Sequence, residues 1–330
     1  MRKRELSLLN VLFCLLVIFI HISSYPLAGY EPKSLPYNGV LFLWRLASFV
    51  VQGFVLLSGL KMFLSSKEKP YFKMLTGKLK VIVLPYAFWY VVYYIFYMII
   101  ADYPINFKFM AKHFFLGSLA PHTYFVPLIM QFFLLYPVWK FMIKKVKPTI
   151  AIPVALLISL FAESCLPIIL YNKNINFIYN DRIFTTYLSY WVIGCYIGAN
   201  YDRICDFFKK HKLIIPYISA IAVNLIFTFI NYNIKYISYL NVIHSFYCLI
   251  TILFLLGLFL KTKDNNKLIT AIDKSSYTIY LCHMLFVFIS NYVFETVLGI
   301  QSNLLLFLMM AITVYPASVF TSIFIKKLRP

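Results

Sequence analysis

The sequence predicts an all-α, polytopic integral membrane protein with about ten transmembrane helices and both termini in the cytoplasm. Of its 330 residues, 62% are hydrophobic and 13% charged, whereas a soluble domain is about half apolar and a quarter charged. Apolar runs of about 20 residues, enough to cross roughly 30 Å of hydrocarbon, recur along the whole chain. The net charge of +20 comes from Lys and Arg residues that collect in alternate loops.

Ten apolar stretches follow one another without a polar region large enough for a soluble domain, so residues 1–330 are expected to form one transmembrane domain. The stretches cover residues 6–25, 40–63, 81–101, 123–142, 149–170, 183–200, 213–231, 241–260, 276–294 and 303–325. The first follows Arg2, Lys3 and Arg4 as a secretory signal would. It is long and lacks a convincing small-residue cleavage site, so we expect an uncleaved span.

The basic residues predict the orientation of these spans. With the N-terminus inside, 24 of the 31 Lys and Arg residues fall in inner segments. The outer segments keep seven, namely Lys33, Arg45, Lys108, Lys112, Lys173, Arg182 and Lys235. Because cytoplasmic loops are enriched in Lys and Arg, this partition places both termini inside, so an even number of spans is expected.

The same charges are spread over short loops, which argues against nucleic-acid binding. The six cysteines contain no C-x-x-C pair, so we expect no metal site.

His21 lies inside the first apolar run, where a polar ring costs free energy unless something uses it. A rise of 1.5 Å per residue places it about 22 Å beyond Leu6, in the outer part of the membrane. Asn10 precedes it by eleven residues, close to three full turns, so both lie on one face. That face predicts a polar path from the inner surface outward. The alternative is a structural histidine bonded to a neighbouring helix.

Several motifs occur in order along the chain. They are GFVLLSGLKMF at 53–63, KLKVIVLPYAFWY at 78–90, HTYFVPLIMQFFLLYPVW at 122–139, YWVIGCYIGANYD at 190–202 and IDKSSYTIYLCHMLF at 272–286. Together with the basic N-terminus and the histidine of the first span, they resemble the membrane-bound acyltransferase 3 family. The resemblance covers nearly the whole chain and is greatest to stand-alone members such as the intercellular-adhesin polysaccharide modification proteins.

The resemblance implies an O-acyltransferase of the cell membrane. It would move an acyl group, usually acetyl, from a cytoplasmic acyl-CoA to a hydroxyl of a cell-surface or lipid-linked glycan. Acyl-CoA would be the donor substrate, with no permanently bound cofactor. The expected partners are membrane lipid, the glycan acceptor, and either a second copy of the chain or glycan-synthesis proteins. An exporter of a sugar or lipid-linked glycan is the alternative, and a sensor or scaffold without chemistry is a third.

Within this reading His21 is the expected general base, because a neutral imidazole can take the proton of a sugar hydroxyl. Glu163, predicted to be the only carboxylate deep in a span, would orient that ring or bind a sugar hydroxyl. A structural ion pair between Glu163 and Arg45 is its alternative. Substrate contacts are expected from Arg45, His122, Tyr124, Gln131, Tyr280 and His283, for which interfacial or structural roles are the alternatives. His283 is placed about 10–12 Å above the inner surface.

The donor side is expected at the inner surface. Lys73, Lys78 and Lys80 would bind coenzyme A phosphates, although membrane topology alone also explains them. Many family members carry Arg or Lys eleven residues before the histidine, where this chain has Asn10. An amide donates a hydrogen bond but brings no positive charge. Arg2, Lys3 or Arg4 would then substitute for that cation near the donor.

Overall fold

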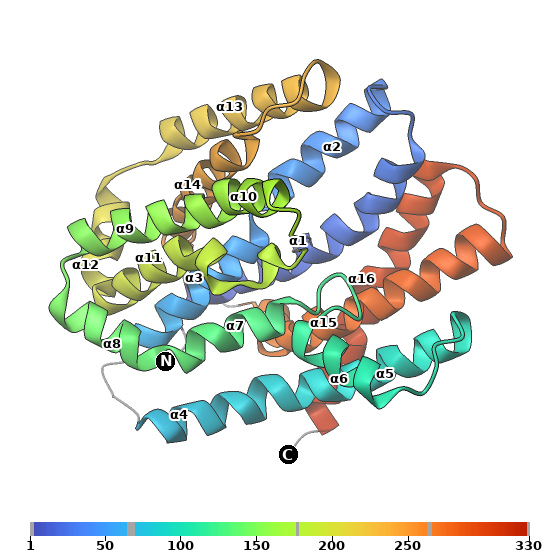
Figure 1. The fold of residues 1–330 in the computed structure, drawn as a ribbon, viewed down its shortest axis with the longest axis horizontal. Helices are drawn as coiled ribbons and strands as arrows, with labels where there is room; N and C mark the ends of the chain where they lie inside the picture. The colour runs from blue at the N-terminus through green and yellow to red at the C-terminus, as the bar shows by residue number, and fades with distance from the viewer. Residues whose placement is uncertain (1–2, 65–69, 176–177, 263–265, 329–330) are drawn as a thin grey trace. The chain divides into compact units, whose positions relative to one another are not determined.

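The fold is known from a computed structural model that describes residues 3–64, 70–175, 178–262 and 266–328 (Figure 1). The basic residues Arg2, Lys67, Lys69, Lys263 and Arg329 lie outside that part of the chain. Most of the described residues are helical and none forms a β-strand, which confirms the all-α prediction. Contacts gather the chain into two compact units, unit 1 formed by residues 1–54 and 205–330 and unit 2 by residues 55–204. The prediction of a single domain stays a prediction.

Eight helical segments of the described chain are long and apolar enough to cross a membrane. They are α1 (Arg4–Gly29), α2 with α3 (Leu35–Ala47, Val50–Phe63), α4 with η1 and α5 (Tyr71–Lys78, Leu79–Val83, Leu84–Ile100), α9 with η2 and α10 (Pro148–Leu160, Phe161–Cys165, Leu166–Asn172), α13 (Ile214–Asn233), α14 (Leu240–Phe259), α15 with η5 (Lys267–Asn291, Tyr292–Val297) and α16 (Asn303–Leu328). The shorter elements are α6 (Phe107–Leu116), α7 (Phe125–Leu134), α8 (Tyr136–Lys145), η3 (Asn180–Arg182), η4 (Phe184–Tyr187), α11 (Leu188–Ala199) and α12 (Tyr201–Lys210).

Among the described residues the number of spans is therefore eight, or nine if α7 and α8 cross together, which agrees with the expected polytopic fold of about ten helices. The predicted fourth span is broken between α7 and α8, which meet at a 55° bend beside Pro137. The predicted sixth span is η4 followed by α11, together about 26 Å long at 2.0 and 1.5 Å per residue. Every residue of α11 from Leu188 to Gly198 is buried. This short helix is thus surrounded by protein.

The helices α1 and α15 run in the same direction. Asn10 bonds Asp273 and Ser276 while the ring of His21 lies beside that of His283, so residue numbers rise together along both helices. Two parallel membrane helices must be separated by an odd number of crossings. Five long spans of the described chain lie between them, or six if α7 and α8 cross together, and only the odd number fits parallel helices. Five gives a total of eight, which supports termini on one side of the membrane.

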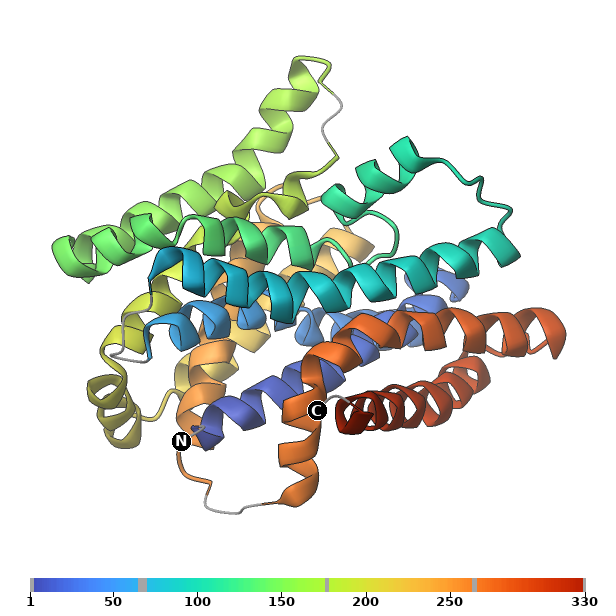
Figure 2. The ribbon, with the colours of Figure 1, turned by 90° about the horizontal axis from the view of Figure 1, so that it is seen from below.

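The core of unit 1 is a group of three helices, α1, α15 and α16. Figures 1 and 2 show α1, in dark blue, beside α15 and α16, in orange to red. The α16 helix runs opposite to α1, since the Tyr315 hydroxyl donates to the Leu15 carbonyl and Phe307 meets Phe19 edge to face. Phe13 is fully buried and packs edge to face on Phe49 and Phe54. Bulky apolar side chains thus fix the position of the polar face of α1.

Unit 2 is held together by a close approach of backbones between α3 and α11. Gly194 and Gly198 are four residues apart and face the Leu56 and Leu60 carbonyls, and a Cβ on Gly59 would lie 2.6 Å from the Trp191 carbonyl oxygen. Small residues at this spacing let membrane helices touch closely. Trp191 is fully buried and stacks on Phe132 with ring centroids 4.5 Å apart. This packing connects α11 to α7.

Candidate active site

The largest set of predicted site residues meets along the contact between α1 and α15. We call this line of polar contacts the α1–α15 seam. It consists of Asn10, Cys14 and His21 on α1 and Asp273, Ser276, Tyr280 and His283 on α15. The predicted common face of Asn10 and His21 therefore exists, and α15 covers it.

One end of the seam is a hydrogen-bonded group around Asn10. The Asn10 Nδ2 atom donates to Asp273 Oδ1 and to Ser276 Oγ, both at 2.8 Å. The Ser276 hydroxyl donates to the Asp273 carbonyl at 2.9 Å, and the Cys14 thiol lies 3.5 Å from the Ser276 carbonyl. Asn10 and Asp273 are 8% and 2% exposed. The Asn10 amide is thus bound to a buried carboxylate.

Asp273 was missed by the sequence reasoning, which singled out Glu163 alone among the carboxylates, and it is more deeply buried in protein than the half-buried Glu163. The ninth span was expected to begin at residue 276, but α15 begins at Lys267. The side chain of Asn266 accepts a hydrogen bond from the Leu268 N–H and caps the helix. Asp273 precedes Ser276 by three residues, the spacing of neighbours on one helix face. Together with the Asn266 cap, that spacing could have revealed it.

The other end of the seam is a pair of imidazoles. The ring centroids of His21 and His283 lie 5.2 Å apart, with the rings tilted by 41°. The prediction that His283 lies much nearer the inner surface than His21 is wrong. The early start of α15 explains the error, because His283 is about 24 Å from Lys267 and His21 about 26 Å from Arg4 along their helices.

The orientation of His283 is set by its own helix. Its Nδ1 atom lies 2.7 Å from the Tyr280 carbonyl oxygen, which can only accept a hydrogen bond. Nδ1 therefore carries the proton, and in the neutral ring the lone pair is on Nε2. The ring of Tyr280 lies 5.9 Å from that of His283 and 6.3 Å from that of Phe54. A catalytic base is commonly oriented by a further group beside it, and His283, held in one tautomer, lies in that position beside His21.

Arg45 lies in unit 1 but in a different polar group. Its side chain is 7% exposed, and Nη2 donates to the Leu240 carbonyl at 3.5 Å. Ser48 Oγ lies 3.0 Å from His244 Nε2, and Asn224 Oδ1 lies 3.1 Å from His244 Nδ1. These contacts join α2 to α13 and α14. Arg45 thus has a structural use, and a substrate contact stays a prediction.

In unit 2 several predicted residues surround one loop. Tyr124 shares a hydrogen bond with Tyr187, and the two phenols interact electrostatically with Asp181. Glu163 lies in the π-helical turn η2, half-buried and within electrostatic range of Tyr187. Single π-helical turns occur often at functional sites. We call Tyr124, Asn180, Asp181, Arg182 and Tyr187 the Arg182 cluster.

Gln131 holds the backbone of this loop. Its Nε2 donates to the Arg182 carbonyl at 2.7 Å and to the Pro127 carbonyl at 3.3 Å, while Oε1 accepts from the Phe184 N–H at 3.1 Å. The amide is therefore engaged with main-chain groups, which supports a positioning role. His122 is also structural in its contacts, since it is 2% exposed and packs against the Tyr93 ring at 5.4 Å.

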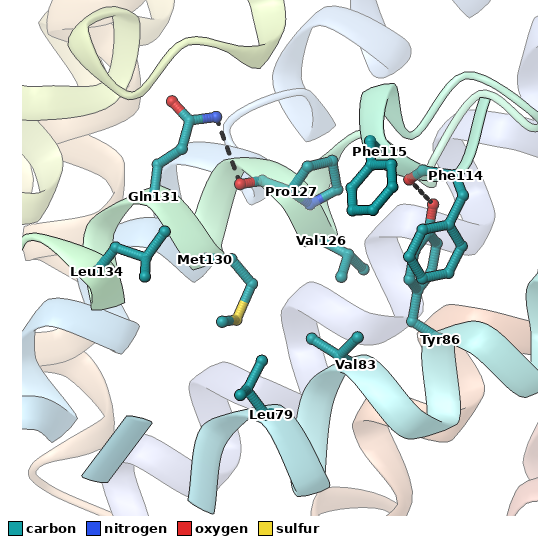
Figure 3. Close-up of a pocket in the computed structure, with 10 residues that line it drawn as sticks. All are labelled: Leu79, Val83, Tyr86, Phe114, Phe115, Val126, Pro127, Met130, Gln131 and Leu134. Carbon is teal, nitrogen blue, oxygen red and sulfur yellow. Dashed lines mark hydrogen bonds between the residues drawn. The ribbon is translucent and has the colours of Figure 1, made fainter. Parts of the chain in front are cut away.

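An apolar cavity of about 280 Å³ lies beside α7 (Figure 3). Leu79, Val83 and Met130 point toward one another across it, whereas the Gln131 amide turns away toward the Pro127 carbonyl. The Tyr86 hydroxyl at its edge donates to the Phe114 carbonyl at 2.7 Å. The polar groups of the lining are thus engaged with the backbone. The cavity offers room for hydrocarbon and no reactive group.

The three predicted donor lysines lie at the start of the third span. Lys73 and Lys80 are exposed. Lys78 is half-buried, with Nζ 4.3 Å from the centroid of the Phe133 ring. Lys80 belongs to the π-helical turn η1. Lys78 thus makes a cation–π contact, and the binding of coenzyme A phosphates by the three lysines stays a prediction.

A family model described as an acyltransferase domain matches residues 4–324. The chain belongs to this acyltransferase family. The match includes both helices of the α1–α15 seam and confirms the resemblance read from the motifs. The protein is thus an acyltransferase and, with its apolar helices, a multi-pass membrane protein. No solved structure matches the chain.

The acyltransferase is also similar to curated proteins of Staphylococcus aureus. Those of strains MSSA476, MW2 and MRSA252 are each 25% identical over 300 residues. The similarity covers 85% of this chain and 81% of each relative. All three are named "Probable poly-beta-1,6-N-acetyl-D-glucosamine export protein".

Proposed function

We propose that this membrane acyltransferase moves an acyl group, most simply acetyl, from cytoplasmic acyl-CoA to a hydroxyl of a cell-surface or lipid-linked glycan at the plasma membrane. The observation that carries the proposal is the contact of His21 with His283 inside an apolar helix group. Two imidazoles at one depth, one with a fixed tautomer, supply a base where hydrocarbon excludes water.

The proposed reaction is one acyl transfer. His21 takes the proton of the acceptor hydroxyl while its oxygen attacks the thioester carbonyl carbon. The tetrahedral intermediate then expels the coenzyme A thiolate, which receives the proton from the imidazolium. The new ester bond replaces the thioester, so atoms and charges balance. His283 stabilises the positive charge that develops on His21 and is held for this by the Tyr280 carbonyl.

The donor is proposed to enter from the side that holds Lys73, Lys78 and Lys80, with the phosphates of coenzyme A on the exposed Lys73 and Lys80. Asn10 brings no positive charge to this path. Its bonds to Asp273 and Ser276 support a structural role at the inner end of the seam. Neutralising Lys73 and Lys80 should therefore raise the donor KM and weaken its salt dependence.

Export of a glycan is the second candidate. The printed name of the relatives supports it, since it describes the export of a polymer of N-acetylglucosamine. The same name makes that polymer the first acceptor to test. The two functions differ in product, because acyl transfer changes the mass of the glycan and export changes its location.

The deciding experiment measures both. The purified protein in lipid nanodiscs is given radiolabelled acetyl-CoA and β-1,6-linked N-acetylglucosamine oligosaccharide, and the sugar is analysed by mass spectrometry. An added acetyl group that is absent with His21→Ala supports transfer. An unmodified sugar, together with polymer accumulating inside cells that lack the protein, would overturn transfer and support export.

A further inference from the structure

The Arg182 cluster contains buried polar atoms that make no hydrogen bond with any described residue. They are Asn180 Oδ1, Asp181 Oδ1, and Nε and Nη1 of Arg182. Arg182 Nε lies 3.5 Å from Asp181 Oδ1, an ion-pair contact without hydrogen-bond geometry. Buried polar atoms in folded proteins are nearly always hydrogen-bonded, so a group of four on consecutive residues indicates that a partner is missing.

The unsatisfied atoms are of both kinds. Arg182 offers two N–H donors, and Asn180 and Asp181 each offer an acceptor oxygen. A phosphate or carboxylate has only acceptors and would lie against the Asp181 carboxylate, which repels it. An apolar ligand would leave all four unsatisfied. The cluster is therefore complementary to a neutral ligand with donors and acceptors side by side, such as hydroxyls or an acetamido group.

The cluster is held in place by bonds that do not use these atoms. Gln131 fixes the Arg182 carbonyl and the Phe184 N–H, and Asn180 Nδ2 donates to the Ala162 carbonyl at 2.8 Å. The Arg182 guanidinium lies 4.9 Å from the centroid of the Tyr179 ring. These contacts connect the loop to α7 and η2. The donors and acceptors are thus positioned before a ligand arrives, which lowers the entropic cost of binding.

The cluster is also reachable. The Asp181 side chain is 46% exposed and that of Arg182 21%, so their buried atoms lie just beneath the surface. The charge pattern predicts that this loop faces outside, where a surface glycan is found. Tyr124 and Tyr187 add two phenols, and aromatic side chains with hydroxyls suit sugar rings.

We propose that Asn180, Asp181 and Arg182 form a subsite for a neutral sugar unit of the glycan, with Arg182 donating to its oxygens and Asp181 and Asn180 accepting from its O–H or N–H groups. This deepens the proposed function and rests on it for the biological role of the glycan. The binding itself is independent of His21.

Equilibrium binding tests the subsite without turnover. Fluorescent β-1,6-linked N-acetylglucosamine pentasaccharide is titrated onto the full-length protein in nanodiscs, without acyl-CoA. Arg182→Met should weaken binding by at least about tenfold, the usual effect of losing a hydrogen bond to a charged group. Lys173→Met removes one positive charge from the same loop and should leave affinity unchanged. Inorganic phosphate should not compete with the sugar.

The outcomes separate the two proposals. If His21→Ala abolishes transfer but binds the pentasaccharide normally, both stand. If wild-type protein transfers acetyl but Arg182→Met and Lys173→Met bind alike, the subsite is wrong and the proposed function survives. Competition by phosphate would overturn the neutral-sugar assignment. Arg182→Lys keeps the charge without the planar fork, so it should bind weakly while its thermal unfolding matches wild type.

Discussion

The rings of His21 and His283 lie 5.2 Å apart on helices that run in the same direction. This arrangement makes two histidines that are 262 residues apart in sequence a single unit. Because the two rings are neighbours, the orientation of α1 in the membrane also decides on which side His283 lies. If His21 faces the outer half of the membrane, His283 does too.

Replacing His21 tests its role as the base. His21→Ala should reduce acyl transfer by about 10²- to 10⁴-fold, the usual effect of losing a general base. His21→Gln retains a hydrogen-bonding group but cannot take up the proton, so it should be nearly as inactive. Transfer is measured with radiolabelled acetyl-CoA, and size-exclusion chromatography checks folding. Near-normal activity of the Gln variant would make His21 a structural residue.

We also predict that His21 and His283 act together in acyl transfer. If the two rings act as one unit, the double variant His21→Ala/His283→Ala should be about as inactive as His21→Ala alone, because residues acting together are not additive. Rates of all four proteins complete the cycle. A double variant slower by the product of both single effects would show that His283 acts separately.

The fold class and the motifs followed from the sequence because they depend on local composition. A run of apolar residues identifies a span whatever its neighbours are. The parallel pairing of α1 with α15 depends on contacts across more than 260 positions, and no periodicity within one helix reports it. The sequence therefore predicted the shared face of Asn10 and His21 but not what covers that face.

Helix boundaries account for two errors at the site. The span containing His283 was started at 276 because Asp273 and Lys274 lowered its apolar character. In the structure Asp273 is buried and bonded to Asn10, so its polarity is satisfied by a helix that is distant in sequence.

The sequence identified Arg182 only as one of the basic residues of the outer loops. Its unsatisfied buried N–H groups arise from how the loop folds back against α7 and η2.

The bond of Asn10 to Asp273 makes a stability prediction. Asn10→Ala removes a donor from a buried carboxylate and should destabilise the protein by about 1–3 kcal/mol. Asn10→Ala/Asp273→Ala should cost less than the sum of the single changes, since the carboxylate is then also gone. Reversible unfolding in mixed micelles measures these differences. Strictly additive effects would show that the bond contributes nothing.

The orientation can be tested with single cysteines in a protein whose six native cysteines are replaced by serine. Lys235→Cys lies between α13 and α14, and Lys261→Cys lies just after α14. A membrane-impermeant maleimide added to intact cells should label the first and not the second. Both should react after the membrane is opened. The reverse pattern would place His21 in the inner half of the membrane and remove the basis for transfer to an outer acceptor.

Acidity should weaken sugar binding through Asp181, which lies in a loop outside the membrane spans. Burial raises the pKa of its carboxyl above the usual aspartate value, and the Arg182 charge only partly offsets this. The N–H and O–H groups of the sugar bond to the ionised carboxylate, so the pKa of Asp181 is lower in the bound state and binding releases a proton near that pKa.

Affinity should be constant at neutral pH and should fall on acidification through the raised pKa of the free carboxyl. The groups that interact with Asp181 directly are Arg182, Tyr124 and Tyr187, which do not change charge in that range. Glu163 beside Tyr187 and His113 beside Arg182 are acid-titratable neighbours, so Glu163→Gln and His113→Gln serve as controls. Asp181→Asn should bind about 10-fold or more weakly at neutral pH and lose the acid dependence. An acid-dependent affinity that persists in this variant would assign the titrating group elsewhere.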